Sequence, residues 1–378
     1  SSTEISDYGI DELVERAIDM AKVAPDDPYA GINEKNTNTK LPPKLSLLDT
    51  FEPKIESLYE NARIAEESAL SVKGITNSEG AESSWSKSSI ALGNTNGFFE
   101  SYSGSSFSIS AAVIAGKGSD MERDYDYSVA RHKSKLEDPK TIGINAAERA
   151  VRRLNPVKID SCELPVVFDW RVASSLLGHF SNAINGQSIA KKTSFLNDKI
   201  NKQIFSKKIN IIDDPHIADG LGSKPFDGEG TQTNKIKIVS NGILKSWILD
   251  LSSSRQLGLR TTGHASRGTS SIPFPSPTNL YLEPGENSLE EIIESLKKGI
   301  YITELIGMGV NGVTGDYSRG AAGFLIENGK ITYPISEITI AGNLNSIFSK
   351  LTPANDLKFK NRTNSPSLLI DEMAVAGN

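Results

Sequence analysis

The sequence predicts an α+β fold made mainly of antiparallel sheets and hairpins, with a few packed helices. Strand-like alternation of apolar and polar residues outnumbers helical spacing along the chain. Asn-Gly pairs between alternating apolar runs indicate tight hairpins at 241–242 and 328–329. Hairpins also outnumber βαβ units, which argues against a parallel sheet. We expect an N-terminal α+β portion over 1–155 and a β-rich C-terminal domain over 156–378.

Length and composition describe an ordinary soluble globular protein. The chain has 378 residues, of which 37% are hydrophobic and 23% charged, and a net charge of −6. The acidic balance, without a face rich in Lys and Arg, argues against a nucleic-acid partner. The single cysteine, Cys162, excludes an intrachain disulfide framework and cannot make a metal site alone. No apolar run is long enough for a membrane helix and no signal peptide is visible, so we expect a cytoplasmic protein without a membrane partner.

Two amphipathic helices are predicted near the N-terminus. Helical spacing of apolar residues over 9–24 and over 52–70 indicates helices that each cover a core. Thr50 is the candidate N-cap of the second helix. A polar loop over 33–40 separates them.

A meander follows, because the period changes to two from about residue 83. We expect hairpins that turn at 94–97 and at 116–118. Along the last strand, Tyr125 and its apolar neighbours alternate with Asp124 and Asp126, which we place on the opposite face. The serines of this region fit either a solvent-exposed face or the wall of a polar groove.

The second half of the chain begins with another helical segment, over 142–154. Residues 166–170 predict a short strand that leads into a helix with Asp169 as N-cap and Gly186 as C-cap. A short helix is expected within 288–300, between the two Asn-Gly hairpins.

Six glycines crowd residues 307–323, which predicts a tightly folded backbone against which protein or ligand packs. The spacing over 307–312 matches the dinucleotide fingerprint, but the stretch enters a hairpin instead of opening a helix, so we do not favour that interpretation. The chemistry lies in one polar block, Asp316, Tyr317, Ser318 and Arg319. Asp316 and Arg319 form either a structural ion pair or part of a peptide-facing surface.

The four histidines show no HExxH arrangement. His179 lies on a predicted helix with Ser175 and Ala183 one turn away, so a structural role is favoured. A Ser/His/Asp triad stays open, although no G-x-S-x-G motif occurs. Asx-turns and caps are the favoured interpretation of the acidic loops near His216. The alternative is a divergent metal site, which would use His216, Asp213, Asp214 and Glu229.

Seven motifs resemble the TldD/TldE (PmbA) peptidase family, and together they span nearly the whole chain. They are MERDYDYS (121–128), KKTSFLNDK (191–199), FDGEGT (226–231), SRQLGLRTTGHA (254–265), TELIGMGVNGVTGDYSRGAAGFLIENG (303–329), YPISEITIAGNL (333–344) and MAVAG (373–377). The GDYSRGAAGF and EITIAGNL blocks resemble the TldE (PmbA) branch. The first helix resembles a point well inside family members and the chain lacks an initiator Met, so we expect that the first part of the family's N-terminal domain is missing through trimming or processing.

The resemblance implies a heterodimeric metallopeptidase that degrades unfolded or modified peptides. Zinc is then held by the TldD-type subunit, on a helix that carries HExxxH, with a cysteine near the C-terminus. The similar helix here, 174–187, places Leu177 and Asn182 at the ligand positions and Gly178 at the general base. This segment contains no glutamate, and no cysteine follows near the C-terminus. We therefore expect no zinc and no catalytic residue in this chain.

These implications predict a non-catalytic TldE-type subunit that pairs with a TldD-type partner and helps to bind extended peptides. A homodimer is the alternative assembly in isolation. Candidates for a peptide groove or a loop network are Asp316, Tyr317, Ser318, Arg319 and His264. Two other functions stay open: a peptidase that is active alone through the divergent metal site, and a regulator of another macromolecule, since the family has also been described as modulating DNA gyrase.

Overall fold

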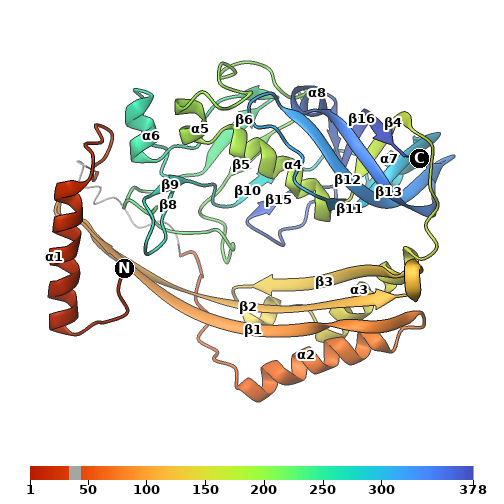
Figure 1. Cartoon of the computed structure of the whole chain (residues 1–378), viewed down its shortest axis with the longest axis horizontal. Helices are drawn as coiled ribbons and strands as arrows, with labels where there is room; N and C mark the ends of the chain where they lie inside the picture. Colours follow the sequence, from red (N-terminus) through yellow and green to blue (C-terminus); the bar gives the residue numbers. More distant parts are fainter. Residues whose placement is uncertain (34–43, 378) are drawn as a thin grey trace.

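The computed structural model describes residues 1–33 and 44–377. A long, twisted three-stranded sheet lies on one side, and a larger β-rich region lies on the other (Figure 1). Most strand pairs are antiparallel, and among the named strands described only β4–β11 and β10–β15 run parallel. The predicted α+β class is confirmed. The polar loop predicted over 33–40 lies almost wholly outside the described residues.

The N-terminal sheet is the predicted meander. Its strands β1 (Ile75–Gly93), β2 (Phe99–Ala115) and β3 (Glu122–Ala130) pair in the order β1-β2-β3. Helices α2 (Ile55–Leu70) and α3 (Pro139–Arg152) cover one face of the sheet. They pack closely against it, because many of the residues in the contact are alanines. The shared core includes Ala65, Ala69, Ile109, Val113, Ile142 and Ala146. Two 3₁₀ turns follow β2 and β3 at Gly118–Asp120 and Lys133–Lys135.

Both predicted N-terminal helices form, but each differs from the prediction in one respect. Helix α1 (Asp7–Val23) forms, but Ile10, Val14 and Ile18 on its apolar face are each about half exposed, so it does not cover a core in the described part of the chain. Helix α2 begins after Lys54 and not at Thr50. Pro53 is the reason, because a proline disfavours helical backbone at the residue before it.

The acidic face of β3 points inward, and not toward solvent. Asp124 and Asp126 are buried, whereas Tyr125 on the opposite face is exposed. Asp126 pairs with Arg149 of α3 at 2.8 Å, and Asp124 pairs with Arg171 at 2.9 Å. Buried carboxylates are tolerated where such partners neutralise them. The predicted alternation is present, but the arginine partners Arg149 and Arg171 on other elements determine which face of β3 lies inside.

The C-terminal region contains a closed ring of strands. Ring closure follows from the additional pairing of β13 with β16. Its members are β4 (Cys162–Phe168), β11 (Lys298–Ile306), β12 (Asp316–Glu327), β13 (Lys330–Asn343) and β16 (Leu368–Ala376), and β14 (Leu351–Pro353) extends it beside β16. Helix α4 (Trp170–Ala183) follows β4 and is capped by Asp169 as predicted. Gly186 is not its C-cap: α4 ends at Ala183 with Ile184 as the C-cap, and Gly186 opens the next short helix.

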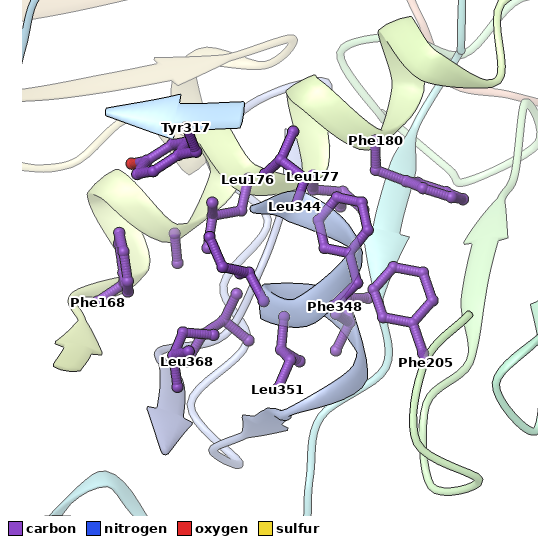
Figure 2. Packing of buried hydrophobic residues seen from close by; sticks show 14 of the residues in the cluster. Phe168, Leu176, Leu177, Phe180, Phe205, Tyr317, Leu344, Phe348, Leu351 and Leu368 are labelled. Carbon is purple, nitrogen blue, oxygen red and sulfur yellow. The ribbon is translucent and has the colours of Figure 1, made fainter. Parts of the chain in front are cut away.

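A second sheet and short helices complete this region. The sheet has the order β15 (Thr363–Asn364), β10 (Leu280–Leu282), β5 (Ile211–Asp213), β6 (Ile236–Ser240) and β7 (Ile243–Leu244), and β8 (Ala265–Ser266) pairs with β9 (Phe274–Pro275). The short helices are α5 (Gly186–Ala190), α6 (Leu251–Gln256), α7 (Leu289–Glu294) and α8 (Leu344–Ser349). Figure 2 shows α4 and α8 sharing one aromatic and aliphatic core, in which the Phe205 and Phe348 rings stack 4.8 Å apart.

The two Asn-Gly hairpins are confirmed. Asn241 and Gly242 join β6 to β7 with φ of 49° and 75°, and Asn328 and Gly329 join β12 to β13 with φ of 49° and 77°. Positive φ at both central positions is the type I′ turn, whose twist matches that of the flanking strands.

Candidate functional site

Helix α4, which carries the predicted metal-helix positions, is anchored by charged groups at its N-terminus. Asp169 accepts hydrogen bonds from the backbone N–H of Arg171, at 2.9 Å, and from the phenol of Tyr301. Burial, followed by the charge of Asp169, raises the pKa of Tyr301 far above its usual value. Arg171 pairs with Asp124 of β3 while both side chains are less than 9% exposed. These contacts tie α4 to the ring and to the N-terminal sheet.

The three predicted metal-helix positions lie in different surroundings. Leu177 is buried and points into the core beside Leu176 (Figure 2). Gly178 borders open space, and Asn182 is exposed. The only imidazole on this helix is His179.

This donor set does not fit zinc. A peptidase zinc site needs three protein ligands and an open position for water. Leucine and glycine offer no side-chain donor atom, so these positions supply only the exposed amide of Asn182, and the neighbouring His179 adds one imidazole. Among the residues that the structure describes, no group of three His, Cys, Asp or Glu side chains is placed to hold a metal ion.

His179 is not the satisfied structural histidine that its sequence neighbours suggest. It forms what we call the α4–β12 cluster with Tyr317 and Arg319. The rings of His179 and Tyr317 meet edge to face at 6.0 Å. The buried Nε2 of His179, Oη of Tyr317 and Nε of Arg319 have no hydrogen-bond partner within the described chain. Burial, and then the charge of Arg319, lowers the pKa of His179, and burial raises the pKa of Tyr317.

The glycine-rich stretch divides into a loop and a strand. Residues 307–315 form the loop, and β12 begins at Asp316. The loop folds back on β12: the N–H of Ser318 donates to the carbonyl of Gly309 at 2.7 Å, and a Cβ at Gly309 would overlap the carbonyl of Ser318. The expected close backbone packing is therefore present at Gly309, where only glycine fits. A hollow of about 610 Å³ lies beside the loop and is lined by 308–312 and 316–318.

The polar block 316–319 is split between two faces because it lies in a strand. Asp316 and Ser318 are exposed, whereas Tyr317 is buried and Arg319 is half-buried. Asp316 accepts hydrogen bonds from the hydroxyl of Thr314 and the amide of Asn343, and these bonds lower its pKa. No ion pair joins Asp316 to Arg319 in the described structure, so the structural ion pair considered for this block does not form.

His264 lies away from this block, in a buried network. Its Nε2 bonds to Asp213 at 3.0 Å, and its Nδ1 bonds to the carbonyl of Thr262 at 2.8 Å. Asp213 also accepts hydrogen bonds from the backbone N–H and the hydroxyl of Thr278. His264 is 1% exposed, and its contacts hold loops together instead of facing a groove.

The residues of the divergent metal site do not converge. Asp213 bonds to His264, while Nε2 of His216 lies 3.1 Å from the hydroxyl of Thr233. Asp214 accepts from the backbone N–H of His216, an Asx-turn as favoured from sequence. Glu229 accepts from the N–H of Leu251 at 2.8 Å, and burial raises its pKa to about 7.

The fold that combines this ring of strands with the meander is shared with known proteins. The chain belongs to the PmbA/TldA metallopeptidase family: the family's central-domain model matches residues 3–154, and its C-terminal-domain model matches residues 161–377. No helix in the described residues has the length and apolarity to cross a membrane.

Similar proteins bear peptidase and gyrase-modulator names. The chain is 39% identical to the Metalloprotease PmbA of Escherichia coli O157:H7 and 36% identical to a Metalloprotease PmbA homolog of Haemophilus influenzae, covering 100% of this chain and 82% of each relative. A Bacteroides thetaiotaomicron structure described as a candidate modulator of DNA gyrase superposes with a TM-score of 0.90 at 27% identity, over 100% of this chain and 85% of that one. TldE from Thermococcus kodakarensis shares the fold, with a TM-score of 0.81 at 24% identity, over 98% and 85%.

Proposed function

We propose that this chain is a cytoplasmic, non-catalytic TldE-type subunit, and that it pairs with a TldD-type peptidase that holds the zinc. The observation that carries the proposal is the surface of α4. At the positions that the family resemblance assigns to the metal site, α4 presents a core leucine, a bare glycine and an exposed asparagine, with His179 as its one imidazole. One imidazole without a neighbouring carboxylate can neither hold zinc tightly nor activate water.

The glycine loop is the part that we assign to the shared peptide-binding chamber. Met308 and Val313 on this loop, and Ile306 at the end of β11 just before it, expose most of their apolar side chains, and Met308 is 88% exposed. Clustered exposed apolar residues beside a hollow are typical of a surface that contacts a partner or a peptide. The backbone around Gly309 is fixed by its bonds to β12, so the loop presents these side chains from a defined position.

The assignment is tested by measuring peptidase activity of this chain alone, of a TldD-type partner alone, and of the two mixed. We expect activity only where the partner is present, an increase on mixing, and no stoichiometric zinc on this chain alone. His179→Ala should leave the activity of the mixture largely intact, because no metal depends on this imidazole. One tightly bound zinc per chain, with chelator-sensitive hydrolysis in the absence of a partner, would overturn the assignment.

The loop's contribution is tested by Met308→Asp. A charge on the loop should reduce the activity of the mixture at least about tenfold while the melting temperature of the chain stays unchanged, because an exposed side chain contributes little to stability. The matched control is Met121→Asp, since Met121 is also exposed but lies by the N-terminal sheet. Equal activity of both variants would remove the glycine loop from the chamber.

A further inference from the structure

A second cavity lies between the N-terminal sheet and the C-terminal loops. Its volume is about 630 Å³, within the usual size range of ligand pockets. One side is formed by residues of β1 and β2 and by Arg131, which follows β3, while residues 221–224, 226–228 and 265–269 and Arg362 form the other side. No single motif in the sequence indicates this cavity, because its walls come from separate segments.

The charged side chains that line the cavity are mostly cationic. They are Arg131, Lys224, Arg267 and Arg362, against one carboxylate, Asp227. Asp227 is 1% exposed, and its oxygens already accept from the backbone N–H groups of Glu229, Thr231 and Ala265 at 2.8 to 3.0 Å. It therefore has little capacity left to bind the cations.

None of the four cations forms an ion pair in the described chain. Arg131 donates to the carbonyls of Ser105 and Leu221, and its buried Nε has no partner. Lys224 donates once, to the carbonyl of Ala265 at 3.0 Å, which leaves two of its three N–H groups available. The side chains of Arg267 and Arg362 are exposed at the rim.

These cations lie close enough to influence one another. Burial lowers the pKa of Arg131, and the charge of Arg362 lowers it further. Burial also lowers the pKa of Lys224, with nearby carboxylates opposing the effect and Arg362 adding to it. Like charges gathered in a partly buried cavity repel each other, so an anion placed among them would be favoured by all of them.

From this arrangement we infer that the cavity binds the carboxylate of a peptide, either an acidic side chain or a free C-terminus. Guanidinium groups match the planar geometry of a carboxylate, and Arg131 and Arg362 supply two of them. Apolar walls beside the cations, including Ile90, Tyr102 and Phe226, suit the rest of a peptide better than a free inorganic anion. The choice of a peptide rests on the proposed function, whereas the preference for an anion follows from the cavity itself.

Isothermal titration calorimetry on the purified full chain tests this inference with three acetylated hexapeptides of one neutral sequence. The first has an amidated C-terminus, the second a free C-terminal carboxylate, and the third an amidated C-terminus with a central glutamate. We expect at least one carboxylate peptide to bind about tenfold more tightly than the neutral one, and the stronger of the two identifies the source of the carboxylate. Equal affinity of all three, or no binding, overturns the inference.

Arg362→Gln should remove this preference, because it deletes a rim cation whose side chain has no partner in the described chain. Arg267→Gln is the second variant should Arg362→Gln fail to fold. Arg260→Gln is the matched control, since Arg260 is exposed and does not line the cavity. Loss of preference in the control as well, or binding of inorganic phosphate as tight as that of the acidic peptide, contradicts the assignment. Peptidase activity of the mixture on a neutral peptide reports separately on the proposed subunit role.

Discussion

At the scale of single residues, two buried tyrosines show how much a hydrogen-bond partner matters. Tyr301 donates to Asp169, whereas the hydroxyl of Tyr317 has no partner within the described chain. Removing an unsatisfied buried hydroxyl relieves a desolvation cost, but removing a bond to a buried carboxylate creates one. Tyr317→Phe should therefore raise the free energy of unfolding by about 1 kcal/mol, while Tyr301→Phe should lower it by about 2 kcal/mol. Urea midpoints measure both, and a destabilised Tyr317→Phe would show that this hydroxyl is satisfied.

Glu229 makes stability depend on pH. Its pKa is about 7 in the folded chain because of burial, against 4.5 for an unperturbed glutamate. Between these pH values the folded state binds more protons at Glu229 than the unfolded state does. The stability contributed by the protonated Glu229 is therefore complete below about pH 4.5, and it is lost as the pH rises through 7. Glu229→Gln should be more stable than the parent chain at pH 8 and should differ less at pH 5. Urea midpoints at both pH values test this, with the exposed Glu148→Gln as a control that should follow the parent chain.

At the scale of elements, the Asn-Gly turns are the most demanding local structures. Gly242 and Gly329 have φ of 75° and 77°, and a Cβ at Gly242 would also overlap the carbonyl of Phe205. Gly242→Val and Gly329→Val should each lower the free energy of unfolding by about 1–3 kcal/mol, and Gly242→Val should cost more. Gly312→Ala is the control, because a Cβ there meets no atom closer than 3.9 Å. Equal urea midpoints for all three variants would contradict the strain argument.

Elements defined by local signals were predictable from the sequence. The Asn-Gly hairpins, the Asp169 cap and the meander each depend on neighbouring residues, and they are present. Features that depend on partners far away in the sequence could not be predicted from local patterns. The inward face of β3 is set by Arg149 and Arg171 on other elements, and the exposure of α1 by the lack of a packing partner in the described chain. The α4–β12 cluster and the cationic cavity likewise join residues that are far apart in sequence.

At the scale of the whole molecule, Asp124 links the N-terminal sheet to α4. It pairs with Arg171 at 2.9 Å, and the two side chains are 4% and 8% exposed. Asp124→Asn would leave a buried guanidinium with less compensation, so we expect a loss of about 3 kcal/mol in the free energy of unfolding. Glu60→Gln on α2 is the control: its ion pair with Arg63 is about half exposed, so its loss should lower the free energy of unfolding much less than Asp124→Asn does. Urea unfolding of both variants tests this expectation. Equal midpoints would show that the buried pair does not stabilise the contact between the sheet and α4.

The closed ring also fixes an order of events during protein synthesis. The N-terminal meander pairs strands that are neighbours in the chain, so it can form with its covering helices once residues up to 152 have left the ribosome. The ring cannot close then, because β4 pairs with β16, about 200 residues later, and β16 also completes the contact with β13. Until β16 emerges, β4 and β13 each lack a neighbour and expose unpaired backbone groups. The growing chain therefore carries a folded first sheet beside an open second one until β16 emerges, and during this interval the unpaired strand edges are open to pairing with other chains.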